Sequence, residues 1–108
     1  MAEIEKLELL MIKRKLRIDL LEEQVNDKKD EMFIIIESEY EEDKKNVFLS
    51  NADKRKIEAK NRLKADVEYI NLVNTLYDLK EIQMVDEVRL RALRRQFIRD
   101  YCQNNLGV

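Results

Sequence analysis

Residues 4–36 read IEKLELLMIKRKLRIDLLEEQVNDKKDEMFIII, and their apolar positions limit what the chain can fold into. Apolar residues recur in steps of three and four, which places them on one face of an α-helix. This seam consists of Ile4, Leu7, Met11, Ile18, Leu21, Val25, Met32 and Ile35, with polar residues at two expected positions. A seam kept over about five heptads is typical of a coiled coil. We therefore predict a first helix over about residues 3–45.

The composition supports long helices throughout the 108 residues. Proline is absent and Gly107 is the single glycine, so the residues that usually interrupt helices are missing. Charged residues make up 41% of the chain and aromatic residues only 6%, a balance typical of extended helices rather than of sheet-containing domains. The chain is predicted to be a single all-α domain over residues 1–108.

A turn is predicted over residues 46–51, which read NVFLSN. Ser50 precedes Asp53 by three residues, which resembles a capping box, and Asn51 is the alternative cap. A side-chain oxygen at this position accepts a hydrogen bond from one of the first amides of a helix. The second helix is then expected over about residues 52–103, with two apolar stripes that need cover on more than one side.

The order of charges favours an antiparallel hairpin that turns near residues 48 and 49. In that arrangement the acidic block 37–43 faces the basic block 54–60, and the arginines that follow residue 88 face Glu3, Glu5 and Glu8. Exposed pairs stabilise little, so the pattern indicates register rather than strength. The same charge order fits an antiparallel contact between two chains, and that alternative stays open.

Five consecutive apolar residues, Met32 to Ile36, point to every side of a helix. A lone hairpin leaves some of them in water, so self-association or capture of a partner protein is expected. A helical-bundle oligomer is the simplest assembly. The predicted oligomer-interface residues are Met32, Phe33, Ile35, Ile36, Tyr69 and Leu76.

Several kinds of chemistry are not expected. The sequence has no histidine, the usual general base and zinc ligand, and no glycine-rich loop that would hold a nucleotide phosphate. We expect no catalytic residue, metal, cofactor or small-molecule substrate. No stretch approaches the roughly 18 apolar residues that cross a bilayer. The acidic start lacks the order of a signal peptide, and Cys102 is the only cysteine. A cytoplasmic protein without membrane contact is predicted.

An arginine-rich run is the strongest binding feature, because no acidic residue interrupts it between Val88 and Ile98. Arginine suits phosphate recognition, and nearby aromatic residues suit stacking on single-stranded bases. The competing interpretation is pairing with acidic helix faces. The nucleic-acid-binding candidates are Arg89, Arg91, Arg94, Arg95 and Arg99, with Lys54, Arg55 and Lys56 after the turn.

The second half resembles a family of small helical proteins. Its elements are residues 49–56 (LSNADKRK), Leu63, Glu68-Tyr69, Leu76, Leu79, Glu87 and residues 93–97 (LRRQF). The stretch is similar to recombination-accessory, mediator-like proteins of tailed phages and prophages. The resemblance implies an oligomer that binds single-stranded DNA and helps to load a recombinase. The acidic first half departs from that pattern.

Three functions remain open. The first is a non-catalytic, oligomerising helical accessory or adaptor protein that acts through protein–protein contacts. The second is a single-stranded-DNA-binding recombination accessory protein that uses the arginine run. The third is a small inhibitor or regulator that lies along a host enzyme.

Overall fold

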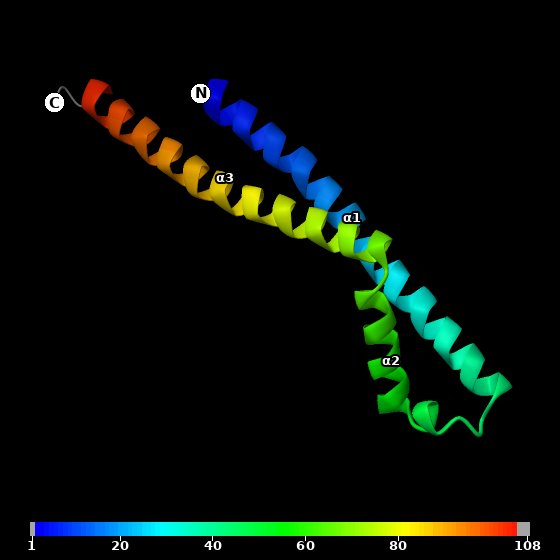
Figure 1. Ribbon diagram of the computed structural model, residues 1–108. Coiled ribbons are helices and arrows are strands. Elements are labelled where there is room, and N and C mark those ends of the chain that lie inside the picture. Colours follow the sequence, from blue (N-terminus) through cyan, green and yellow to red (C-terminus); the bar gives the residue numbers. More distant parts are fainter. Residues whose placement is uncertain (1, 106–108) are drawn as a thin grey trace. The chain divides into compact units, whose positions relative to one another are not determined.

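A computed structural model describes residues 2–105 (Figure 1). These residues form the long helix α1 (Ala2–Glu42), the short 3-10 helix η1 (Val47–Leu49), and the helices α2 (Ala52–Lys64) and α3 (Val67–Asn105), and they contain no strand. The prediction of an all-α chain is confirmed. None of these helices has an apolar stretch long enough to cross a bilayer.

The chain divides into two compact units. The terminal unit contains residues 2–19 and 77–105, and the central unit contains residues 20–76. In the terminal unit, Leu7, Ile18 and Leu90 are buried. Inside each unit, the segments that pair run in opposite directions. In the terminal unit, Glu8 pairs with Arg94 and the later Arg14 pairs with the earlier Asp86. In the central unit, Lys28 pairs with Asp66 and the later Glu37 pairs with the earlier Arg55.

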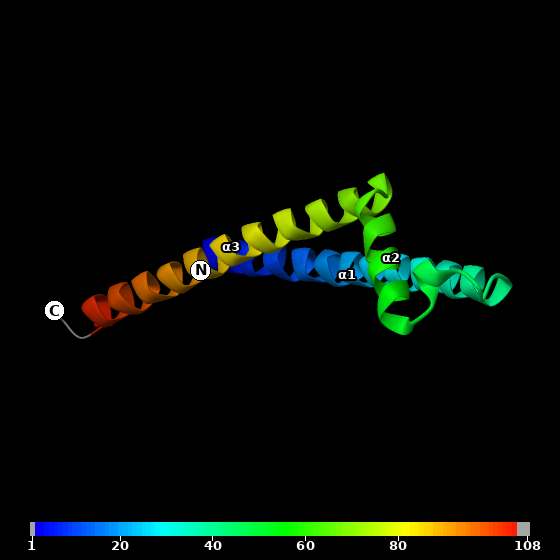
Figure 2. The same ribbon diagram turned by 60° about the horizontal axis from the view of Figure 1, so that its bottom comes forward.

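The core of the central unit forms where η1 and α2 fold back beside the second half of α1 (Figures 1 and 2). Ile36 is completely buried there and packs with Leu49 and Ala59, while Met32 and Tyr40 cover the cluster from α1. Ile36 was predicted to lie in an oligomer interface. Its burial corrects that prediction, because a side chain enclosed by its own chain is not exposed to another copy. Leu76, also assigned to an oligomer interface, is likewise buried.

The predicted second helix is interrupted, which corrects its span of residues 52–103. α2 ends at Lys64, and α3 begins at Val67. Asp66 explains the break without glycine or proline, because its side chain accepts a hydrogen bond from the amide of Tyr69 at 3.1 Å and caps α3. The same carboxylate lies 3.8 Å from the Lys28 amino group on α1. Local capping and the ion pair together favour a new helix start over continuation.

The connection between α1 and α2 begins earlier than predicted. α1 ends at Glu42 instead of about residue 45, and the Asp43 carboxylate accepts a hydrogen bond from the Lys45 amide at 3.3 Å. Asn46 caps η1 by accepting from the Phe48 amide at 2.9 Å. Asn51 caps α2 by accepting from the Lys54 amide at 2.9 Å, so of the two predicted caps the structure uses Asn51.

Candidate functional site

A polar cluster joins α1 to α3 in the terminal unit. The guanidinium of Arg14 donates to the Asp86 carboxylate at 2.7 Å and to the Gln83 side-chain oxygen at 2.9 Å. The Gln83 amide nitrogen donates in turn to the Met11 carbonyl at 2.9 Å. Only 12% of the Arg14 side chain and 14% of the Asp86 side chain are exposed. Arg14, an interruption of the apolar seam, is therefore a partner in a sheltered network.

The arginine run separates into paired and unpaired members. Arg89 pairs with Glu3 at 3.4 Å, and Arg94 pairs with Glu8 at 3.1 Å. The interpretation of the run as structural pairing therefore holds for these two residues. Within residues 2–105, Arg91, Arg95 and Arg99 have no acidic partner, and all three are exposed. Their spacing of four residues places them along one face of α3, so this face carries unneutralised positive charge.

Two of the three basic candidates after the turn are engaged within the chain. Arg55 donates to Glu37 at 2.7 Å and to the Leu49 carbonyl at 3.0 Å, and it stacks 4.4 Å above the Tyr40 ring. Lys54 donates to the Val47 carbonyl and to Ser50 in the connection. These contacts assign Lys54 and Arg55 to holding the turn. Lys56 is exposed and lines a groove.

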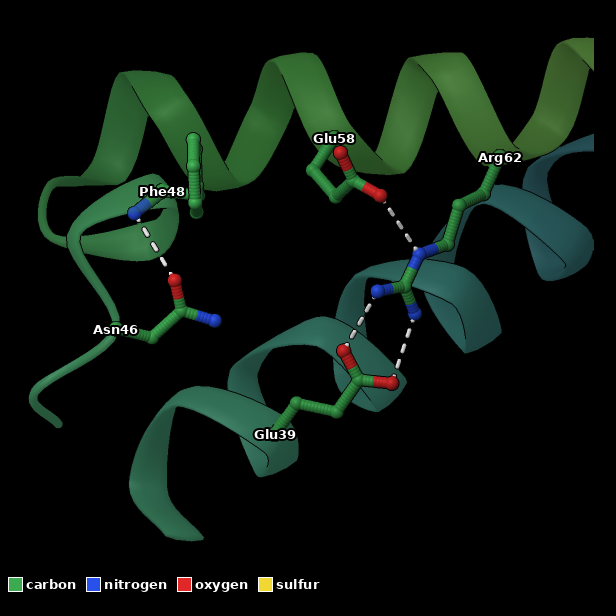
Figure 3. Close-up of polar contacts among 5 residues, drawn as sticks. All are labelled: Glu39, Asn46, Phe48, Glu58 and Arg62. Carbon is green, nitrogen blue, oxygen red and sulfur yellow. Dashed lines mark hydrogen bonds and ion pairs between the residues drawn. The ribbon is translucent and has the colours of Figure 1, made fainter. Parts of the chain in front are cut away.

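Arg62 of α2 binds one carboxylate on α1, that of Glu39, and one on its own helix, that of Glu58 (Figure 3). Its guanidinium makes two parallel hydrogen bonds to Glu39, at 2.8 and 2.7 Å, and a third to Glu58 at 2.9 Å. The hydrogen bond to Glu39, followed by the one to Glu58, raises the pKa of Arg62. The hydrogen bond from Arg62 correspondingly lowers the pKa of Glu39 below its ordinary value. Paired forks of this kind fix geometry as well as charge.

The lowered pKa of Glu39 predicts a loss of stability in acid. A carboxylate whose pKa is lower in the folded than in the unfolded state stabilises the fold above the unfolded value of about 4.3, and this contribution disappears as pH falls through the folded pKa. In thermal melts at pH 7, Glu39→Gln should melt below the wild type, and the difference should shrink towards pH 3. Glu42→Gln, at an exposed position about one turn further along α1, is the matched control. Equal differences at both pH values would contradict the assignment.

The remaining predicted interface residues lie at different depths. Phe33 and Ile35 are 40% and 47% exposed, so both are available to a partner. Met32 and Tyr69 are half-buried: Met32 packs on the central core, and Tyr69 lines the same groove as Lys56. The structure therefore leaves Phe33 and Ile35 as the exposed members of the predicted interface.

An exposed apolar stripe on α1 was not identified from the sequence. Leu9, Ile12 and Leu16 follow one another in steps of three and four, and they are 54%, 59% and 66% exposed. We call these three residues the outer stripe. Leu7 and Ile18 of the same segment are buried against the terminal unit, so the outer stripe is a second apolar face. Its spacing is visible in the sequence but is masked by the stronger seam beside it.

No protein-family model matches this chain, and neither a curated protein nor a solved structure matches it. Function therefore has to be inferred from the surfaces that the helices present.

Proposed function

We propose that this protein is a non-catalytic, oligomerising helical accessory or adaptor protein that acts through protein–protein contacts in the cytoplasm. The outer stripe is the observation that carries the proposal, because three large aliphatic side chains lie in water on one helix face. Burial of one such side chain stabilises an assembly by roughly 1.5–3 kcal/mol. A helix face of this kind is a common docking surface for another helix.

The same proposal includes an antiparallel coiled-coil hairpin as the fold of each chain and a helical bundle as the assembly. Pairs between early α1 and late α3, and between later α1 and α2, support an antiparallel coiled-coil hairpin with one interruption. Two or more such hairpins that pack their outer stripes together would form a helical bundle. In that bundle α1 presents its seam to its own chain and its outer stripe to the neighbouring copy.

A charged residue in the outer stripe should disrupt self-association. For Leu16→Asp we expect the dissociation constant of the oligomer to rise by at least about tenfold, because the substitution removes an apolar contact and places a charge in the interface. Sedimentation or light scattering across a concentration series measures this change, and circular dichroism verifies that the helices remain.

Arg17→Ala is the matched control for that measurement. It lies one residue further along α1, is exposed and changes the net charge by the same amount. The control should assemble like the wild type. A wild-type protein that stays monomeric at high concentration would refute self-association through this stripe, and adaptor function would then depend on a different partner.

The unpaired arginine face supports one alternative function, a single-stranded-DNA-binding recombination accessory protein. Arg91, Arg95 and Arg99 are exposed cations in a row, which is the charge distribution that tracks a phosphate backbone. A small inhibitor or regulator of a host enzyme is a further possibility, but no contact in the described residues favours it.

Charge removal on α3 tests DNA binding. If the alternative is right, Arg91→Ala/Arg95→Ala should weaken binding to a labelled single strand and reduce the salt slope by about 0.7 for each lost phosphate contact. Arg89→Ala/Arg94→Ala removes the same charge from residues already paired with glutamates, so its effect should be smaller. The absence of wild-type binding at low salt would exclude the alternative.

A further inference from the structure

The central unit contains a groove of about 530 Å³ with an apolar floor and a basic rim. Phe33 and Leu63 contribute to the floor, and Tyr69 also lines the groove. The rim is formed by four lysines from α1 and α2: Lys29, Lys56, Lys60 and Lys64. We call this surface the basic groove.

The rim carries positive charge that its own unit does not neutralise. In the described part of the chain, none of the four lysines has a carboxylate partner, and all four are exposed. Among the described residues that line the groove, Asp30 is the only acidic one. The chemistry of the basic groove therefore fits an occupant that is both apolar and negatively charged.

Another face of the same unit has the complementary character. Ile34 and Ile35 on α1 are 63% and 47% exposed. Glu31 lies one turn before them and Asp27 two turns before them, and both carboxylates are exposed as well. We call these four residues the acidic face. Each copy of the central unit therefore displays both halves of a complementary pair.

Lys28, the lysine nearest to the acidic face in sequence, feels the charge of Glu31 but makes its close contacts with other carboxylates. The Lys28 amino group is held by α3, because it donates to the Glu68 carboxylate at 2.9 Å and lies 3.8 Å from the Asp66 carboxylate. Helical spacing also matches the two surfaces, since Asp27 and Glu31 are four residues apart, as are Lys56 and Lys60 on the rim. Charge and spacing are thus both complementary.

We propose that the basic groove binds the acidic face of a second copy of this chain. The inference rests on the self-association proposed above and assigns it a second contact, distinct from the outer stripe. The contact would place two isoleucines over an apolar floor and the rim lysines beside two carboxylates. A nucleic-acid strand would neutralise the lysines but would leave Ile34 and Ile35 in water, so the complementarity favours a second copy.

Reciprocal charge reversal tests this contact. Lys56→Glu/Lys60→Glu makes the groove acidic, and Asp27→Lys/Glu31→Lys makes the face basic. Each double variant sets like charges against each other, and we expect either one to weaken the oligomer on the order of tenfold. All four substitutions in one chain exchange the two signs and should restore most of the affinity. Sedimentation at low salt measures the assembly, with circular dichroism as the folding check.

Arg91→Glu/Arg95→Glu is the control, because it matches the groove variant in charge change and lies on the terminal unit. Wild-type assembly that neither reversal weakens would overturn the basic-groove contact and leave the outer-stripe proposal standing. Loss in both double variants without recovery in the fourfold variant would also overturn it. A monomeric wild type would instead refute the proposed self-association itself. If only the groove variant loses affinity for a labelled single strand, with assembly unchanged, the groove is a polyanion site and the proposal is wrong.

Discussion

Ile36→Ala is expected to lower the free energy of unfolding by about 3 kcal/mol, the middle of the range for removing a large aliphatic side chain from a core. Ile36 is completely buried, and its contacts with Leu49 and Ala59 join α1, η1 and α2. Removing its outer atoms leaves a cavity at the point where all three elements meet. A denaturant melt should show the loss, and a thermal melt should show a midpoint lower by roughly 12–15 °C.

Ile35→Ala provides the matched comparison, since the same substitution is made at the neighbouring position on α1. Ile35 is 47% exposed, so its truncation should affect unfolding much less. Similar losses at residues 35 and 36 would contradict the structure, in which α1 turns Ile36 and not Ile35 into the core. The pair also separates folding from assembly, because Ile35 belongs to the acidic face and Ile36 to the core.

Asp86→Ala should destabilise the terminal unit by about 2 kcal/mol, a value within the range for hydrogen bonds to charged groups. The substitution leaves the sheltered guanidinium of Arg14 without its carboxylate at 2.7 Å, and the remaining partner, Gln83, is neutral. Breaking such a pair from one side is costly because the other charge stays in a partly dehydrated position. Chemical denaturation measures the change in the free energy of unfolding.

Two variants make the Asp86 experiment decisive. Glu87→Ala removes an exposed carboxylate one residue away, and it should leave the stability nearly unchanged. Arg14→Met/Asp86→Leu removes both charges and should recover much of the loss, because no unpaired charge is left. If Asp86→Ala and Glu87→Ala behave alike, the Arg14 cluster contributes no more than an ordinary surface pair.

Helix content and the position of the turn could be predicted because they depend on local signals. The apolar seam predicted a long first helix, and α1 runs without interruption from Ala2 to Glu42. Asn51 was one of two named caps and is the one that α2 uses. These features depend on residues within one or two turns of each other, which the sequence displays directly.

Features that depend on contacts between residues far apart in the sequence could not be predicted from the sequence pattern. The break before α3 depends on Asp66, which caps α3 and also lies 3.8 Å from the amino group of Lys28, a residue far away in the sequence. The burial of Ile36 but not Ile35 depends on which side of α1 receives α2. Charge order predicted that arginines face glutamates, but only side-chain geometry separates paired Arg94 from unpaired Arg95.

The break between α2 and α3 also bears on how this sequence can tolerate change. In a continuous helix, one inserted residue rotates everything beyond it by about 100° and turns an inward-facing stripe outwards. Two non-helical residues, Ala65 and Asp66, end that propagation, because α3 takes its starting point from its own cap. A one-residue insertion within α2 would therefore rotate the part of α2 that follows it, while the phase of α3 is preserved. Which side chains of the 39-residue helix α3 face inward is therefore set independently of the helix before it.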